Sequence, residues 1–451
     1  MTEVRVVILA AGKGTRMRSP RPKVLHRVMG RTLLGHVLAA CQGIGPVTVI
    51  VGHGAEEVQA HFSQEPITWV LQREQKGTGH ALQQLLTPLR DFQGRVLVVN
   101  GDAPLVTPYT LQRLVQAQTA ALLAATVPDP TGYGRVFCSG PYVRAIVEEK
   151  ECTPAERAHS FINGGAYCFD WPTLAPLLQG LGAANSQGEY YLTDVFQHLE
   201  RVVALEASDW REVWGVNNRA ELSRAGQALN QRILEHWLLA GVEVIDPVTT
   251  TIEVTVDLAP EVVIEPGSHL RGNTTVAAGA VIGPGSLIEN SAIGAGSEIL
   301  YSVVRNSVVG ERVTVGPYAH LRAGTVIADC CRIGNFVEIK NTQIGARTNA
   351  AHLSYLGDST VGARVNIAAG TITANYDGMH KHPTILKDDV KTGVNCTFVA
   401  PVTVGEGATI AAGSVINEDV PPHSLAIARA RQVVKEGWKP RSPQEECAHE
   451  D

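Results

Sequence analysis

A glycine-rich turn with two nearby cations is the first feature of the chain that could do chemistry. Residues 9–17 read LAAGKGTRM and directly follow a short apolar run, and Lys23 comes shortly afterwards. Such a turn lets backbone N–H groups approach a phosphate chain, and Arg16 and Lys23 can neutralise a triphosphate. The segment is neither a Walker A loop nor the dinucleotide fingerprint, because Met17 stands where that fingerprint needs its third glycine. A solvated surface turn is the plainer alternative.

Several polar motifs follow in the first half of the chain. Residues 96–102 form an apolar run that ends in Asp102. This carboxylate is suited to holding Mg²⁺ against phosphates, although a turn or helix-cap aspartate is the commoner use. Residues 72–80 (QREQKGTGH) supply amides and a backbone turn that can read a pyrimidine edge. The later motifs are residues 129–135 (DPTGYGR), Glu148, Asn163 with Gly164, residues 187–194 (QGEYYLTD) and residues 215–218 (GVNN).

Short apolar strands alternate with helical patterns up to about residue 217. The expected strands include 4–10, 47–51 and 96–99, and the expected helices include 33–41 and 78–86. This alternation predicts a parallel, Rossmann-like α/β sheet, whose ligands bind at the carboxyl ends of the strands. The motifs that follow strands therefore belong at that edge. Residues 218 to about 240 are expected to form one long helix that links two domains.

A hexapeptide period begins after Pro247. Aliphatic residues recur six positions apart, often followed by glycine, and the longest series are Ile252, Leu258, Ile264, Leu270, Val276, Ile282 and Ile288, then Val309, Val315, Leu321, Ile327, Ile333 and Ile339. Each unit makes a short strand and a tight corner, three units make one coil, and the aliphatic side chains fill the interior. The C-terminal half is therefore predicted to be an all-β, left-handed parallel β-helix, with a loop ejected over 374–383.

Polar side chains stand among these repeats. Arg322 and Lys340 could clamp a sugar phosphate. His352 is a natural base to take a proton from an amine that attacks a thioester. A surface imidazole is the usual alternative for one histidine on a β-helix. His352 lies, however, within the string AHLSYLGD at residues 351–358.

Both halves resemble one known family. The turn at 9–17, followed by Pro22-Lys23, looks like the signature of sugar-nucleotide pyrophosphorylases. With the later motifs and residues 351–358, nearly the whole chain is similar to the bifunctional bacterial N-acetylglucosamine-1-phosphate uridyltransferase / glucosamine-1-phosphate N-acetyltransferase family. The resemblance implies acetyl transfer from acetyl-CoA to glucosamine 1-phosphate. It then implies uridylyl transfer from UTP to N-acetylglucosamine 1-phosphate, with release of pyrophosphate. It also implies a homotrimer with acetyl-transfer sites between subunits.

The resemblance also implies roles for single residues. Arg16, Lys23 and His352 are expected to be catalytic, with His352 as general base, and Asp102 and Asn217 are expected to hold Mg²⁺. The residues implied to bind UTP or the nucleotide sugar are Leu9, Ala10, Ala11, Gly12, Lys23, Gln72, Gly77, Thr78, Gly134, Glu148, Asn163 and Asn217. Those implied to bind glucosamine 1-phosphate are Arg322, Lys340, Tyr355 and Asn366. Those implied to bind acetyl-CoA are Ala369, Asn375, Tyr376, Val394, Ala412 and Arg429.

Four positions depart from the family pattern. Asn100 stands where tyrosine is common, Gly164 where threonine is common, and Glu149 where histidine is common. The first two bear on the sugar contacts. Val394 replaces a serine whose hydroxyl contacts acetyl-CoA, and losing one neutral hydrogen bond costs about 0.5–1.5 kcal/mol, or roughly tenfold in affinity. Weaker acetyl-CoA binding or slower transfer is expected, with activity retained.

Composition limits the kinds of partner that are expected for this protein. The 451 residues carry a net charge of −6 and no basic block, which argues against nucleic acid. No run of 18 apolar residues is present and the 8 cysteines form no C-x-x-C pair. A cytoplasmic protein with reduced thiols and no membrane partner is therefore expected. The expected domains are 1–217 and 247–451, joined by 218–246.

Two other functions stay open from the sequence. A nucleotidyltransferase with a non-catalytic β-helix would not need the polar set around His352. A regulatory protein without chemistry would not need Arg16, Lys23 and Asp102 together. A different sugar or base, such as glucose or dTTP, also stays open for the first half.

Overall fold

In the computed structural model, which describes residues 3–439, the first predicted strand lies inside a nine-stranded sheet with the order β5-β4-β1-β6-β10-β7-β11-β9-β8. The strands are β1 (Val4–Ala10), β4 (Val47–Val51), β5 (Ile67–Leu71), β6 (Arg95–Asn100), β7 (Ala120–Thr126), β8 (Arg135–Ser139), β9 (Tyr142–Val147), β10 (Phe161–Asp170) and β11 (Val202–Glu206). The predicted parallel arrangement holds from β5 to β6. Strand β10 runs antiparallel to β6 and β7, which the strand–helix alternation did not predict.

Helices cover the two faces of this sheet. The α-helices are α1 (Leu33–Ala40), α2 (Ala55–His61), α3 (Thr78–Gln83), α4 (Pro108–Gln116), α5 (Pro154–Arg157), α6 (Trp171–Gln179) and α7 (Arg219–Leu239). The short 3-10 helices are η1 (Thr15–Met17), η2 (Lys23–Leu25), η3 (Leu192–His198) and η4 (Trp210–Val213), and a small hairpin joins β2 (Arg27–Val28) to β3 (Arg31–Thr32). Along β1, Val6 and Ile8 enter one buried cluster while Val7 enters the other, so the sheet has a core on each side.

Two compact units divide the chain. The first runs to His236 and includes Ile252–Val254, and the second contains the other described residues from Trp237 onward. Helix α7 corresponds to the long helix predicted over 218 to about 240. Among residues 3–439, no helix combines the length and the apolar character that a bilayer crossing needs.

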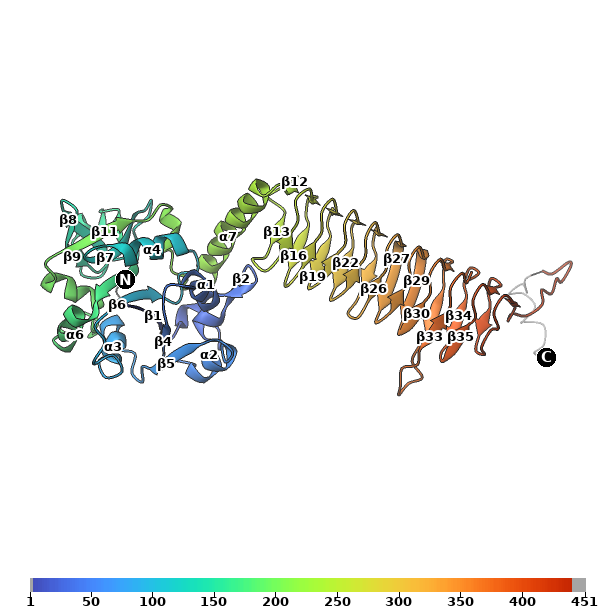
Figure 1. Cartoon of the computed structure of the whole chain (residues 1–451), viewed down its shortest axis with the longest axis horizontal. Coiled ribbons are helices and arrows are strands. Elements are labelled where there is room, and N and C mark those ends of the chain that lie inside the picture. Colours follow the sequence, from blue (N-terminus) through green and yellow to red (C-terminus); the bar gives the residue numbers. More distant parts are fainter. Residues whose placement is uncertain (1–2, 440–451) are drawn as a thin grey trace, which may run out of the picture. The chain divides into compact units, whose positions relative to one another are not determined.

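The second unit consists of short parallel strands stacked in three faces (Figure 1). The first face holds β12 (Glu243–Val244), β15 (Val263–Ile264), β18 (Val281–Ile282), β21 (Glu298–Ile299), β24 (Thr314–Val315), β31 (Asn366–Ile367), β36 (Thr409–Ile410) and β38 (Leu425–Ala426). The second holds β16 (His269–Arg271), β19 (Leu287–Glu289), β22 (Val303–Arg305), β25 (His320–Leu321), β32 (Ile372–Ala374), β34 (Thr397–Val399) and β37 (Val415–Ile416), and β13 (Thr251–Ile252) precedes them in the chain. The third holds β14 (Asp257–Leu258), β17 (Thr275–Val276), β20 (Ala292–Ile293), β23 (Val308–Val309), β26 (Val326–Ile327), β28 (Gln343–Ile344), β30 (Ser359–Val361), β33 (Thr384–Leu386) and β35 (Val402–Val404).

Stacked aliphatic side chains form the interior of this second unit. Ile264, Ile282, Ile299, Val315 and Ile333 pair in succession from coil to coil, and all five are buried. Each coil therefore contributes one inward residue to a continuous apolar column, as the hexapeptide period predicted. The predicted parallel β-helix is confirmed.

Two longer strands position the polar residues of this unit. Strands β27 (Arg332–Lys340) and β29 (Asn349–Gly357) run from the first face into the second. Phe336 and Leu353 bend them at the corner and have positive φ values of 58° and 46°. Between β32 and β33 the chain leaves the coils in the predicted loop, which projects from the stack (Figure 1).

Candidate active sites

A cavity of about 670 Å³ opens at the carboxyl ends of β1 and β6. Its lining includes Leu9, Ala10, Ala11, Gly12, Arg16, Lys23, Gln72, Gly77, Thr78, Asp102, Glu148 and Asn217. A smaller cavity of about 230 Å³ shares Leu9, Thr78, Asp102, Glu148 and Asn217 with it and adds Gly134 and Asn163. Every residue that the sequence assigned to the nucleotide sugar therefore lines one of two adjoining cavities.

Two cations and two oxygen donors meet inside the larger cavity. The Lys23 ammonium forms an ion pair with Asp102 and donates to Asn217 Oδ1 at 3.2 Å. Arg16 Nη2 donates to the same Asn217 oxygen at 2.9 Å. The Asp102 carboxylate and the Asn217 amide oxygen therefore both contact a positively charged side chain. Mg²⁺ prefers hard oxygen ligands of this kind. Mg²⁺ usually takes only one or two protein ligands beside phosphates and water, so the donor set fits this ion.

Glycine at position 14 lets Lys23 reach this cavity. Gly14 has φ +63°, and a Cβ added there would lie 2.7 Å from Lys23 Cβ. No side chain fits in that space without moving η2, which begins at Lys23. The glycine-rich turn therefore positions the lysine as well as leaving room for a phosphate chain.

The same cavity is also lined by Gln72, which is only 3 % exposed. Gln72 Nε2 donates to the Gly77 carbonyl at 3.2 Å and lies 3.0 Å from His80 Nδ1. Tyr190 holds this loop from outside, because its carbonyl accepts from the Gly79 N–H at 2.8 Å. A Cβ at Gly77 would lie 2.6 Å from that same carbonyl oxygen, so the close approach requires glycine. Nothing in the sequence indicated this role for Tyr190.

The smaller cavity contains the acid predicted to contact the sugar. Burial raises the pKa of the Glu148 carboxyl, and a hydrogen bond from Thr193 at 2.8 Å partly offsets this effect. Asn163 Nδ2 lies 2.7 Å from the hydroxyl of Tyr167, which also lines this cavity. Sequence reasoning missed Tyr167, which lies four residues after Asn163 within β10.

Two departures from the family pattern fit their surroundings. A Cβ at Gly165, where φ is +72°, would lie 2.2 Å from Asn100 Nδ2. A Cβ at Gly164 would lie 2.6 Å from Val213 Cγ1. The glycine pair therefore permits Asn100 and Val213 to pack against this bend of β10. A threonine at 164 would require Val213 to move, and a side chain at 165 would displace Asn100.

On the β-helix, one corner carries five of the predicted acetyl-transfer residues. Directly after His352, the Leu353 carbonyl accepts a hydrogen bond of 2.9 Å from the Gly370 N–H of the next coil. The corner then continues through Ala369, Val394, Ala412 and Arg429. The hydrogen bonds along it run from Asn395 N to Ala369 O at 2.8 Å, from Gly413 N to Val394 O at 2.8 Å and from Arg429 Nη1 to Ala412 O at 2.7 Å. These residues therefore form a row along the helix axis, suited to an extended ligand such as acetyl-CoA.

His352 has a partner that fixes its protonation geometry. Its Nδ1 lies 3.1 Å from Asn335 Oδ1, and the two residues pair directly across β27 and β29. An amide oxygen can only accept, so in the neutral imidazole this contact favours the tautomer with the proton on Nδ1 and the lone pair on Nε2. Sequence reasoning missed Asn335, although its spacing of one coil from His352 was a usable signal.

A cationic cluster lies at the other end of the same strands. Arg322 Nη1 pairs with Glu338 at 2.7 Å, and the neighbouring Lys381 ammonium lowers the pKa of Lys340. Glu338 in turn pairs across the strands with Tyr355. Lys381 belongs to the projecting loop, whose other predicted residues lie close by: Asn375 donates to Asp358, and Tyr376 Oη donates to the Gly378 carbonyl at 2.6 Å.

The structure does not bring all predicted acetyl-transfer residues together within one chain. Lys340 pairs with Gly357, five residues beyond His352 on β29. The corner at Leu353 lies between these two positions, so they stand on different faces of the β-helix. Asn366 lies on the first face, where it pairs with Asn349. His352 and Asn366 therefore lie before this corner, and Lys340 lies beyond it.

Known families and proteins are similar to this chain in both of its halves. Residues 6–169 match the family described as the MobA-like NTP transferase domain, residues 252–346 match the GMPPB C-terminal domain, and residues 383–418 match the bacterial transferase hexapeptide (six repeats). A bifunctional protein GlmU from Acaryochloris marina is 50% identical over 97% of this chain and 98% of its own length. GlmU proteins from Trichormus variabilis and a Cyanothece species are 51% and 52% identical over 97% and 98% of this chain and 99% of their own length. At this identity and coverage, the chain belongs to the GlmU family of bifunctional proteins.

Proposed function

We propose that this protein makes UDP-N-acetylglucosamine in two steps, acetylating glucosamine 1-phosphate on the β-helix and uridylylating the product in the first unit. The observation that carries the proposal is the convergence of Arg16, Lys23, Asp102 and Asn217 on one cavity. The acetyl-transfer step is assigned to residues 247–451 and the uridylyl-transfer step to residues 1–217, joined by 218–246, in a cytoplasmic enzyme.

One incubation tests both steps. The protein is supplied with glucosamine 1-phosphate, acetyl-CoA, UTP and Mg²⁺, and free CoA thiol and pyrophosphate are followed separately. Thiol that appears before pyrophosphate supports the two reactions in series. Pyrophosphate that appears only with ready-made N-acetylglucosamine 1-phosphate would instead make the β-helix a scaffold.

Uridylyl transfer needs positioning and charge neutralisation more than a base. A phosphate oxygen of the sugar phosphate is already anionic at neutral pH and can attack the α-phosphorus of UTP directly. Arg16 and Lys23 lie where they can neutralise the triphosphate as the bond to pyrophosphate breaks. Asp102 and Asn217 would hold Mg²⁺, which supplies further neutralisation of the phosphates when bound.

Acetyl transfer needs a base near the amine. His352 Nε2 is free of the Asn335 contact and can take the proton of the attacking amine. The amine nitrogen bonds to the thioester carbonyl carbon, and the C–S bond then breaks to release CoA. Arg322 and Lys340 would bind the sugar phosphate, while Arg429 at the end of the corner row would face the phosphates of CoA.

We further propose that the β-helix associates as a homotrimer. Tyr301, Tyr318, Phe336 and Leu353 form an exposed apolar row along one corner, here called the corner ladder. The Tyr301 and Tyr318 rings lie 5.7 Å apart in a tilted arrangement, and the Tyr318 and Phe336 rings stack at 5.6 Å. All four residues have positive φ, which is costly for large side chains. A neighbouring subunit that covers the ladder could also bring its own cationic cluster toward His352, which one chain does not do.

Changing Phe336 to glutamate is expected to break this association. A charge would replace an apolar group that the neighbour covers, so the protein should elute as a monomer on size-exclusion chromatography with light scattering. Acetyl transfer should fall with the trimer, while uridylyl transfer persists. Val308→Glu is the matched control, because Val308 is exposed on another face. A trimeric Phe336→Glu protein would contradict the assignment of this surface.

Changing Val394 to serine is expected to tighten acetyl-CoA binding. Val394 is exposed in the corner row between Ala369 and Ala412, where a hydroxyl could make one more hydrogen bond. The dissociation constant measured by calorimetry should fall about tenfold. Val394→Ala is the control, since it shortens the side chain without adding a donor. Equal affinity for the serine and alanine variants would show that the hydroxyl has no partner in the bound state.

A further inference from the structure

The two proposed metal ligands are carried by two separate loops. Asp102 follows β6 and precedes α4, while Asn217 follows η4 and precedes α7. The loops touch directly at one backbone bond, from Val216 N–H to the Asp102 carbonyl at 2.9 Å. Within the cavity, Lys23 also contacts both side chains, and further contacts outside the cavity hold the two loops against each other.

Glu212 forms the first of two additional links between the loops. It lies in η4, is only 3 % exposed, and its Oε2 accepts from the Thr107 N–H at 3.0 Å and the Thr107 hydroxyl at 2.8 Å. Thr107 also caps α4 by accepting from the Thr110 N–H at 3.2 Å. The carboxylate thus fixes the end of the Asp102 loop to the start of the Asn217 loop.

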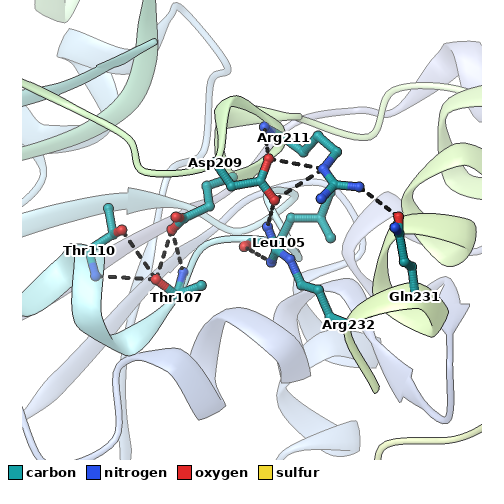
Figure 2. Close-up of polar contacts among 8 residues, drawn as sticks. Leu105, Thr107, Thr110, Asp209, Arg211, Gln231 and Arg232 are labelled. Carbon is teal, nitrogen blue, oxygen red and sulfur yellow. Dashed lines mark hydrogen bonds and ion pairs between the residues drawn. The ribbon is translucent and has the colours of Figure 1, made fainter. Parts of the chain in front are cut away.

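Arg232 forms the second link, from helix α7 (Figure 2). Its Nη1 donates to the Leu105 carbonyl at 2.6 Å, and its Nη2 donates to Asp209 Oδ2 at 2.8 Å. Leu105 lies in the loop after Asp102, and Asp209 directly precedes η4. One planar guanidinium on α7 therefore joins the loop after Asp102 to the start of η4, the helix that leads into the Asn217 loop. A single ammonium cannot reproduce this geometry.

Arg211 holds the acceptor of this link in place. Its Nε donates to Asp209 Oδ1 at 2.9 Å, and its Nη1 donates to Gln231 Oε1 at 2.9 Å, next to Arg232 on α7 (Figure 2). Partial burial raises the pKa of Asp209, but the hydrogen bonds from Arg211 and Arg232 outweigh it and bring the pKa to about 2. Asp209 is therefore a constant negative acceptor at neutral pH.

We propose that Arg232 and Glu212 are positioning residues for the metal and triphosphate site. Together they brace the two loops so that Asp102 and Asn217 stay at a separation suited to one divalent ion. Neither residue is among those that line the nucleotide cavity, so both act through the loops. The inference rests on the proposed uridylyl-transfer function, and it adds residues that no motif in the sequence indicated.

Replacing Arg232 by methionine tests the brace in the full-length protein. Mn²⁺ is titrated in the presence of UTP and without sugar phosphate, and free Mn²⁺ is followed by electron paramagnetic resonance. Outer contacts of metal ligands typically change affinity tenfold or more, so the Mn²⁺ dissociation constant should rise about tenfold. Arg232→Lys should fall between, because it can keep one of the two contacts. In steady-state assays the Mg²⁺ requirement should rise more than the KM for the sugar phosphate.

Arg113→Met is the matched control. Arg113 lies on α4 and also donates to a backbone carbonyl, that of Glu206 at 3.1 Å, but it does not join the two loops. Its Mn²⁺ affinity should equal that of the unchanged protein. Glu212→Gln gives a second test, and it should weaken Mn²⁺ binding in the same direction.

The possible results separate the brace from its alternatives. Unchanged Mn²⁺ affinity in Arg232→Met and Glu212→Gln, or an equal loss in Arg113→Met, would overturn the proposal. Thermal unfolding of the first unit, followed on the same samples, reports whether a variant is simply less folded. If the unchanged protein releases no pyrophosphate at all, the proposed reaction fails. The Mn²⁺ titration still tests the brace in that case, because it requires no turnover.

Discussion

Replacing His352 by alanine is expected to slow acetyl transfer by about 10²- to 10⁴-fold while leaving uridylyl transfer unchanged. The amine of glucosamine 1-phosphate must lose a proton as it attacks the thioester. The lone pair of His352 Nε2 can accept that proton. His352 is exposed, so its removal leaves no buried cavity and should hardly change stability. The release of CoA thiol measures the first reaction and the release of pyrophosphate from ready-made N-acetylglucosamine 1-phosphate measures the second.

Asn335→Ala gives a graded comparison for this prediction. The variant removes the acceptor that holds Nδ1 protonated, at 3.1 Å in the structure, but leaves the imidazole in place. Water can replace the acceptor at this exposed position, so the loss of acetyl transfer should be smaller than for His352→Ala. Full acetyl-transfer activity in His352→Ala would remove this residue as the base and would favour a scaffold role for the β-helix.

The β-helix could be predicted from sequence because its rule is local. A residue such as Ile282 lies inward for the same reason as Ile264 and Ile299, since each repeat places one aliphatic side chain at the same point of the coil. The period therefore predicts both the strands and the buried column. The antiparallel direction of β10 is different, because an apolar strand has no sequence mark for its direction and only its neighbours in the sheet decide it.

The residues of the candidate sites also differ in whether the sequence alone could identify them. The turn at 9–17 and Asp102 could be found from sequence because a strand end and its loop are neighbours in the chain. Glu212 and Arg232 could not, because their partners come from other elements and no short motif contains them. The separation between His352 and the cationic cluster also depends on where a corner falls in β29. Residue types thus indicate the chemistry, and the tertiary contacts decide the geometry.

Arg16→Ala is expected to lower the rate of uridylyl transfer by about 10²- to 10³-fold, the usual cost of removing one preorganised group that stabilises transition-state charge. Arg16 lines the nucleotide cavity and donates to Asn217, so its guanidinium lies beside both the triphosphate and the proposed metal. Because charge builds on the phosphates during transfer, kcat should fall more than UTP affinity. Pyrophosphate release at saturating UTP and Mg²⁺ measures the effect.

Two arginine variants make the Arg16 result specific. Arg16→Lys keeps the charge but loses the planar fork, so it should recover part of the rate. Arg18→Ala removes another exposed cation in the same segment that is not among the cavity-lining residues, and it should leave the rate unchanged. Equal losses in Arg16→Ala and Arg18→Ala would point to a general charge effect on UTP attraction, which added salt would abolish. A loss confined to Arg16, and insensitive to salt, would place its guanidinium against the phosphates during the transfer itself.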